Sequence, residues 1–185
     1  EKVRMVEAAP IPCDCFNVLF PKTMDLVGTD SGIGQMTRYL GGLFPRLRRI
    51  GAKIVVFGSG KVRARPTAMD FASAYGRLVS VTRKIGEIAE PFGITVVIEP
   101  LNRTETNMIC SVGEGAILAA DAGRPNVQLL ADAYHMQMEG EAMENIGRVG
   151  RLTHVHIASR EGRAYPLREE EASRRLFAQL SAIGY

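Results

Sequence analysis

The chain has 185 residues, of which 46% are hydrophobic and 23% are charged, and its formal net charge is +3. That composition is ordinary for a soluble globular protein, and the length suits one domain spanning residues 1–185. The small net charge gives no argument for binding nucleic acid or a membrane surface, and no apolar run approaches the roughly 20 residues that cross a bilayer. Three cysteines do not make a disulfide framework, so we expect a cytoplasmic protein.

Short apolar runs predict five strands, namely Ile11–Phe20, Lys53–Phe57, Thr95–Ile98, Val127–Leu130 and Leu152–Ile157. Helical spacing of apolar residues predicts a helix after each strand, namely Gln35–Ile50, Ala68–Phe92, 112–122, Gly140–Val149 and Arg168–Ile183. Pro45 is expected to break or kink the first helix, and the segment 21–34 before it is expected to be a loop. Ser111 and Glu114 have the spacing of a capping box at the start of the third helix.

Alternation of strands and helices along one chain is typical of a parallel α/β sheet. Two architectures fit this alternation, a (β/α)₈ TIM barrel and an open doubly wound sheet. A complete barrel needs eight units and about 250 residues, whereas this sequence supplies about five β/α units. If the fold is a barrel, the sequence is therefore a partial barrel.

Three of the predicted strands end in residues that bind metals. Glu99 directly follows Thr95–Ile98, Asp132 follows the fourth strand, and His154 and His156 lie two apart on the fifth. The carboxyl ends of parallel barrel strands converge on one mouth, so we expect these side chains to meet there. Carboxylates and imidazole in one place suit a divalent cation such as Mn²⁺, Mg²⁺, Co²⁺ or Zn²⁺.

Each of these residues also has a structural interpretation. Glu99 could pair with Arg103, and Asp132 could cap the turn after its strand. His154 is expected to be a hydrogen-bonded core histidine, because two ring ligands from one strand would crowd a site. Taken together on successive strands, Glu99, Asp132 and His156 favour a site over three separate structural roles.

Two further features have weaker functional interpretations. The loop Gly58–Gly60, with Arg63 and Arg65, could hold a phosphate, but a tight turn with solvated arginines is the favoured interpretation. Cys13 and Cys15 could form a metal pair, but buried, reduced thiols are favoured instead.

Four stretches together resemble one family. IEPLNRTETN (98–107), ADAYHM (131–136), HVHIASREGRAYP (154–166) and VVFGSGKVRARP (55–66) are similar to the xylose-isomerase-like TIM barrels, the sugar phosphate isomerases and epimerases. That family includes the ketose 3-epimerases, and AP endonucleases of family 2 are structural relatives. The resemblance implies a (β/α)₈ barrel whose mouth holds one divalent metal, with Mn²⁺ preferred.

The resemblance also implies a role for individual residues. Glu99, Asp132 and His156 match metal ligands, and Glu99 is in addition one of the two catalytic acid/base carboxylates. The side chains that match substrate-contacting positions are Glu105, His135 and Arg163, with Arg160 close enough to compete with Arg163. The family's last ligand is a second Glu on a strand that would follow Tyr185, so we expect a fragment cut at both ends.

The function implied is that of a metal-dependent sugar or sugar-phosphate isomerase or epimerase. The metal polarises a carbonyl, a Glu removes the neighbouring proton, and an enediolate follows. The partner is a small sugar or sugar phosphate, homo-oligomers are possible, and we expect the 185-residue fragment itself to bind metal weakly and to be inactive.

Three alternatives remain open at this stage. An AP-endonuclease-like phosphodiester hydrolase would use more metals and histidines, and a stronger basic stripe, than this chain offers. A non-catalytic sugar-binding barrel would keep its ligand affinity after Glu99→Gln. An open nucleotide-binding sheet would need the G-x-G-x-x-G sequence, which does not follow any of the predicted strands.

Overall fold

The computed structural model describes residues 2–29 and 32–185, so the predicted loop 21–34 lies partly outside the described residues. Five strands form one parallel sheet in chain order, β1-β2-β3-β4-β5. Their bounds are Cys15–Phe16 (β1), Ile54–Phe57 (β2), Thr95–Ile98 (β3), Val127–Asp132 (β4) and His154–His156 (β5). The chain is therefore a curved partial barrel of about five β/α units, as the sequence predicted.

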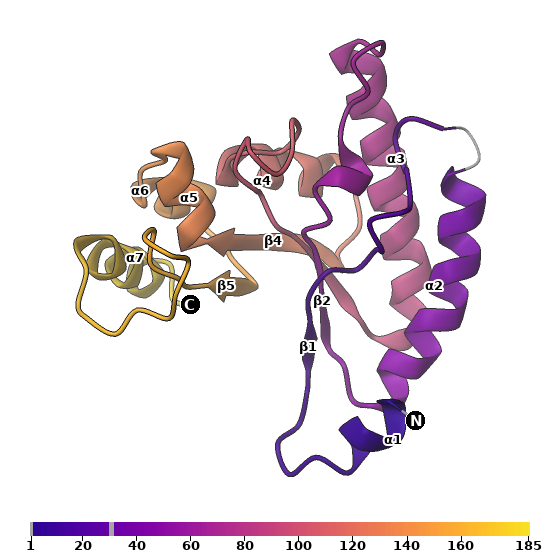
Figure 1. Cartoon of the computed structure of the whole chain (residues 1–185), viewed down its shortest axis with the longest axis horizontal. Helices are drawn as coiled ribbons and strands as arrows, with labels where there is room; N and C mark the ends of the chain where they lie inside the picture. The colour runs from indigo at the N-terminus through magenta and orange to yellow at the C-terminus, as the bar shows by residue number, and fades with distance from the viewer. Residues whose placement is uncertain (1, 30–31) are drawn as a thin grey trace.

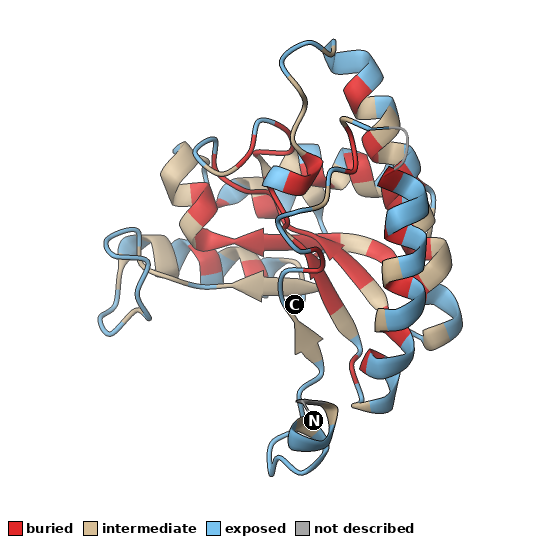
Figure 2. Ribbon diagram, turned by 45° about the vertical axis from the view of Figure 1, so that its right-hand side comes forward, coloured by how far each residue is buried: buried red, intermediate tan, exposed pale blue. Residues whose placement is uncertain are grey.

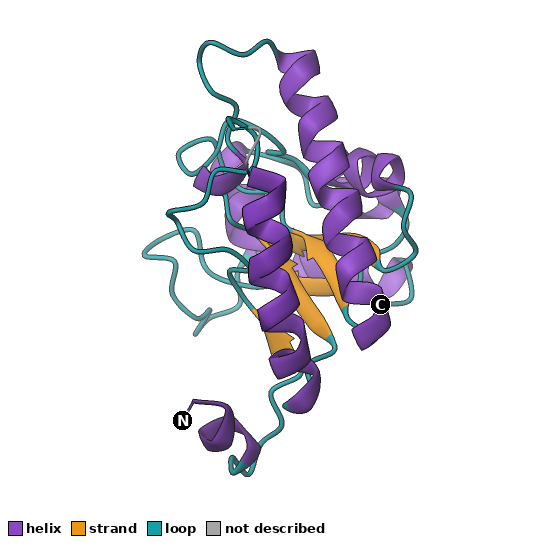
Figure 3. Cartoon of the chain, turned by 90° about the vertical axis from the view of Figure 1, so that its right-hand side faces the viewer, coloured by secondary structure: helices purple, strands orange, loops and turns teal. Residues whose placement is uncertain are grey.

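A short helix precedes the first strand, and the other helices follow the strands and cover the outer face of the sheet (Figure 1). Their bounds are Lys2–Glu7 (α1), Gly32–Arg49 (α2), Phe71–Ala89 (α3), Val112–Ala122 (α4), Ala133–Glu139 (α5), Glu144–Val149 (α6) and Glu171–Ala182 (α7). Two 3₁₀ turns, Lys61–Arg63 (η1) and Glu90–Phe92 (η2), complete the elements. Figure 3 shows the long helices α2 and α3 standing side by side in front of the strands.

The main core lies between the sheet and these outer helices. Alternate residues of β2 and β3, such as Val55, Phe57, Val96 and Ile98, face the helices and are essentially inaccessible to solvent. The residues between them face the inside of the barrel, where Val56, Val97 and Leu130 form a smaller cluster. Figure 2 shows this burial concentrated in the central strands, while β1 and β5 at the sheet's ends are half-buried.

The first strand is much shorter than predicted, because only Cys15 and Phe16 pair with β2. Pro10 and Pro12 have no N–H to donate, and Val18 has φ of 59°, which turns the backbone out of the extended conformation. The same segment corrects the expectation of buried thiols, because Cys13 is exposed.

The helices differ from prediction mainly at their ends. α3 begins at Phe71 because Asp70 caps it, its Oδ1 accepting the N–H of Ser73 at 2.9 Å. α2 continues through the exposed Pro45 without a break. Ser111 caps α4 as expected, but Glu114 accepts from the N–H of Cys110 rather than from that of Ser111. Among the described residues, no helix is long and apolar enough to cross a membrane.

The largest error concerns the segment after β4. The sequence predicted a helix over Gly140–Val149, whereas the structure has α5 directly after β4 and then α6. Gly140 has φ of 65° and ends α5 instead of starting a helix.

Candidate metal and substrate site

The alternation of side chains along the strands positions three polar residues at one mouth. Val97 and Leu130 point into the barrel, so Glu99 and Asp132, each two residues further on, point the same way. His156 pairs with Asp132 in the β4–β5 register, which brings the last strand's imidazole to the same edge. The carboxyl ends of β3, β4 and β5 thus meet there.

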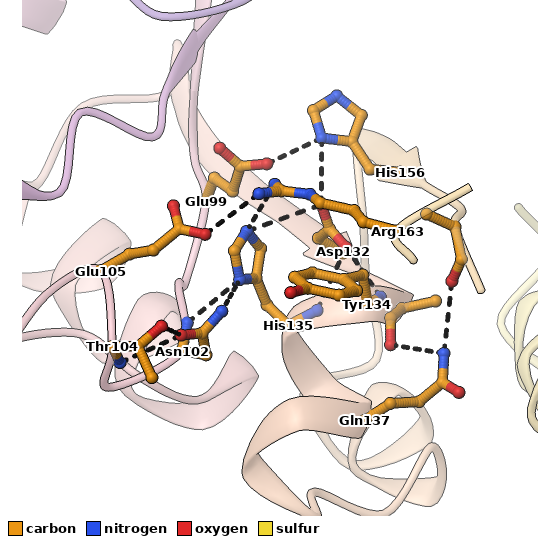
Figure 4. Close-up of polar contacts among 12 residues, drawn as sticks. Glu99, Asn102, Thr104, Glu105, Asp132, Tyr134, His135, Gln137, His156 and Arg163 are labelled. Carbon is orange, nitrogen blue, oxygen red and sulfur yellow. Dashed lines mark hydrogen bonds and ion pairs between the residues drawn. The ribbon is translucent and has the colours of Figure 1, made fainter. Parts of the chain in front are cut away.

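His156 contacts both carboxylates directly (Figure 4). Nδ1 of His156 lies 2.7 Å from Oε1 of Glu99 and 3.5 Å from Oδ2 of Asp132. One ligand atom from each residue lies within 4.8 Å of the others, which is close enough to share one metal ion. Both carboxylates are buried. Two carboxylate oxygens and one imidazole nitrogen are donors that fit a divalent cation.

Asp132 caps a helix with one carboxylate oxygen and turns the other toward His156. Its Oδ1 accepts the N–H groups of Tyr134, at 2.8 Å, and of His135, at 3.2 Å, and so caps α5. Its Oδ2 faces His156. The capping hydrogen bonds fix the carboxylate's orientation, so the other oxygen is held toward the candidate metal position.

The other structural alternatives are resolved as well. Arg103 pairs with Glu139 and not with Glu99, so the predicted structural pair is wrong. His154 is half-buried, and its Nε2 lies 3.4 Å from Sγ of Cys15. This contact fits the expected hydrogen-bonded core histidine.

The contacts within this group of side chains shift the pKa values of His156 and Asp132. Burial by itself would lower the pKa of His156, but hydrogen bonds to Asp132 and Glu99, and their charges, raise it to about 9. Burial also acts to raise the pKa of Asp132, but the hydrogen bond with His156 and the charge of His135 outweigh it, so that the pKa is lowered. The imidazolium thus supplies the positive charge between two carboxylates where a cation fits.

The hydrogen bonds around His135 indicate which of its two ring nitrogens carries the proton. Its Nδ1 lies 3.1 Å from the backbone N–H of Asn102 and 2.9 Å from the side-chain amide of Asn102, so Nδ1 accepts. Burial lowers the pKa of His135 against the opposing charge of Asp132, which favours the neutral ring. A neutral ring that accepts at Nδ1 carries its proton on Nε2, which can therefore donate to a ligand.

Arg163 approaches the same point from the loop after β5. Its guanidinium lies 3.0 Å from Oε1 of Glu105, 3.1 Å from Nε2 of His135 and 4.6 Å from the centre of the Tyr134 ring. Because Nε2 of His135 and the guanidinium are both donors, neither satisfies the other. Two converging donors suit an oxygen atom of a bound ligand. Arg160, the competing candidate, is exposed and has no such contacts within the described chain.

The structure therefore brings together all six residues proposed from the sequence. Sequence reasoning placed Asn102 in a polar loop that could bind or position a substrate, but it did not predict that Asn102 holds His135. It gave no role to Tyr134, against which Arg163 packs. The adjacency of Tyr134 to Asp132 in ADAYHM was a usable signal, but the contact of Asn102 with His135 spans 33 residues and had none.

The phosphate hypothesis for the loop after β2 is not supported in the form predicted. Arg63 is fully buried and donates to backbone carbonyls, and Arg65 donates to the carbonyl of Met69 at 2.7 Å. The favoured alternative of solvated arginines is also wrong for Arg63. Gly58–Gly60 instead lines a cavity of about 330 Å³ that also reaches Glu105.

Comparison with known proteins identifies the family of the chain. The model of the family described as xylose isomerase-like TIM barrel matches residues 33–185. The chain therefore belongs to the xylose isomerase-like TIM-barrel family.

The similar proteins include sugar epimerases. L-ribulose 3-epimerase of Mesorhizobium japonicum is 30% identical over 155 residues, covering 81% of this chain and 48% of the relative. D-psicose 3-epimerase of Agrobacterium fabrum is 34% identical over 92 residues, covering 48% of this chain and 31% of the relative. A crystal structure of D-psicose 3-epimerase in the presence of D-fructose has a TM-score of 0.79 at 23% identity, covering 92% of this chain and 61% of that chain. The chain thus spans about half or less of the length of these two curated relatives.

Proposed function

We propose that the whole protein is a metal-dependent sugar or sugar-phosphate isomerase or epimerase. The observation that carries this proposal is the cluster of Glu99, Asp132 and His156, whose ligand atoms lie within 4.8 Å of one another beside converging donors. Similarity to ketose 3-epimerases at 30–34% identity supports the reaction class. Because the chain spans only part of these relatives, the activity is proposed for the whole protein.

In this proposal Glu99, Asp132 and His156 hold the divalent cation, with Mn²⁺ preferred over Mg²⁺, Co²⁺ and Zn²⁺. The bound cation supplies positive charge that polarises a substrate carbonyl and so acidifies the neighbouring C–H. The protein's own task is to place His156 where it can give up its proton as the cation binds, and to orient both carboxylates. The capping hydrogen bonds of Asp132 do this for one of them.

Glu99 is the proposed catalytic base. It is a buried carboxylate at the end of β3, and a carboxylate with little surrounding water is well suited to remove a proton from carbon. The other hydroxyl oxygens of the sugar accept hydrogen bonds from Nε2–H of His135 and from the guanidinium of Arg163, which lie side by side, and Glu105 accepts from a hydroxyl group. The acid that returns the proton is proposed to lie outside this chain.

The test uses deuterium. The whole protein, loaded with Mn²⁺ and incubated with D-fructose in D₂O, is expected to place deuterium on the carbon next to the carbonyl, as NMR would detect. Glu99→Gln is expected to abolish this exchange while leaving the fold intact. A protein that binds the sugar equally well before and after Glu99→Gln, and never exchanges deuterium, would instead be a sugar-binding barrel. Residues 1–185 alone are proposed to form one domain, to bind Mn²⁺ weakly and not to turn over.

A further inference from the structure

Arg63, at the end of η1, has the most unusual environment of any charged residue in the described chain. Its side chain is 0% exposed, and its guanidinium carbon lies 5.5 Å from the centre of the Phe57 ring. Burying a charge costs several kcal/mol in typical proteins unless polar groups compensate it. A surface loop needs no such residue for its own turn, so the contacts of Arg63 must explain its burial.

Those contacts join two strands. One terminal nitrogen donates to the carbonyl of Phe57 at 2.7 Å, and the other donates to the carbonyl of Glu99 at 2.6 Å. Phe57 is the last residue of β2, and Glu99 directly follows β3. The two arms of one rigid, planar guanidinium therefore bridge neighbouring strands at the barrel's mouth.

The bridge lies where the ladder between β2 and β3 stops. The N–H of Glu99 reaches the carbonyl of Phe57 only at 3.4 Å, and Pro100 has no N–H with which to continue the pairing. Without another donor, these buried carbonyls would be poorly satisfied and the strand ends could separate. Arg63 supplies the hydrogen-bond donors that the backbone after β3 lacks.

We propose that Arg63 is a positioning residue for Glu99, fixing its backbone so that its carboxylate meets Asp132 and His156. This inference rests on the proposed function, because it concerns the same metal site. Arg63 touches neither metal nor substrate and acts only through the strand ends. Lysine would not replace it, because a single ammonium cannot present two donors in the fixed geometry of the guanidinium.

The remaining nitrogen of the guanidinium has no competing role. Nε of Arg63 has no hydrogen-bond partner, and within the described residues no carboxylate forms an ion pair with this side chain. The two strand-end carbonyls are therefore the polar groups that hold Arg63 in place.

The experiment measures Mn²⁺ affinity by electron paramagnetic resonance for the 185-residue chain and its variants. Arg63→Lys and Arg63→Met are each expected to bind Mn²⁺ at least about tenfold more weakly per folded molecule. Arg65→Met is the matched control, because it removes an arginine of the same loop whose partner is the carbonyl of Met69. We expect the control to bind as the original chain does.

A second measurement separates positioning from stability. In the metal-free chain, the ring NMR signals of His156 report its hydrogen bond to Glu99, so they should move in Arg63→Lys and stay unchanged in Arg65→Met. If the 185-residue chain does not bind Mn²⁺, the proposal that these residues alone bind the ion weakly fails, and the ring signals alone decide the role of Arg63. Unchanged Mn²⁺ affinity or unmoved His156 signals in folded Arg63→Lys overturn the proposal. So does unfolding of both Arg63 variants, because that would make the residue purely structural.

Discussion

The carboxylate of Glu99 rests against the backbone of Gly58, and a methyl group placed on Gly58 would lie 1.7 Å from Oε2 of Glu99. Real side chains do not approach this closely, so any other residue at position 58 must displace the carboxylate. The end of β2 therefore forms one wall of the candidate metal site. This contact explains why a glycine follows the buried run of β2, independently of any phosphate-binding role.

Gly58→Ala should accordingly lower the affinity for metal, with a smaller effect on the stability of the fold. We expect Mn²⁺ affinity to fall by about tenfold or more, because Glu99 is pushed away from Asp132 and His156. The matched control is Gly41→Ala in α2, where an added methyl group meets nothing within 4 Å. There the change should leave Mn²⁺ binding intact and stabilise the helix by up to about 1 kcal/mol. Equal Mn²⁺ affinity in the two variants would contradict the proposed wall.

The raised pKa of His156 makes the stability of the metal-free chain depend on pH. Its pKa is about 9 in the folded chain, compared with an ordinary value of 6.5. The stabilisation is therefore fully present below pH 6.5 and is lost as the pH rises toward 9. Urea unfolding should show a loss on the order of 2 kcal/mol over this window, after allowing for partial solvent screening. His156→Asn should remove most of that dependence, and an equally steep loss in His156→Asn would place its origin elsewhere.

Metal binding should show the opposite pH dependence. Below pH 9 the cation must displace a proton from His156, so Mn²⁺ affinity is expected to rise by about tenfold per pH unit from neutrality toward 9. Calorimetry in buffers with different ionisation enthalpies would count the released proton. Affinity that does not change with pH would mean that His156 is not a ligand.

Sequence reasoning succeeded where a residue's role follows from its own strand. The β-branched run Thr95–Ile98 forms β3 with the predicted bounds, and its last position places Glu99 in the mouth. It failed where one residue serves two elements: Asp132 both ends β4 and caps α5, so no gap in the pattern marked a new helix. The burial of Arg63 was equally invisible, because it depends on a carbonyl 36 residues away in the chain.

Sequence alone could not decide between Arg163 and Arg160 as the substrate-binding arginine. The structure predicts different effects on sugar binding when each is replaced. Arg163 reaches Glu105 and His135, so Arg163→Ala in the whole protein should weaken sugar binding by about 10- to 100-fold through lost charged hydrogen bonds. Mn²⁺ affinity should not change, because Arg163 has no place among the metal ligands. Arg160→Ala is the control and should bind both ligands normally. Calorimetric titration would check this, and a larger loss in Arg160→Ala would reverse the assignment.

The two roles of Asp132 can be separated by choosing what replaces it. Asparagine keeps an oxygen that accepts from the N–H groups of Tyr134 and His135, but it removes the negative charge facing His156. Asp132→Asn should therefore lose Mn²⁺ binding while its helix cap stays within about 0.5 kcal/mol of the original.

Asp132→Ala removes both functions at once. It should lose Mn²⁺ binding and, in addition, about 1 kcal/mol of stability, because the start of α5 is left uncapped. Thermal unfolding of the metal-free variants would measure the second effect, and Mn²⁺ titration the first. Normal Mn²⁺ binding in Asp132→Asn would leave capping as the residue's only task and remove one of the three proposed ligands. The cation would then lack the second carboxylate that distinguishes this cluster from a simple Glu–His pair.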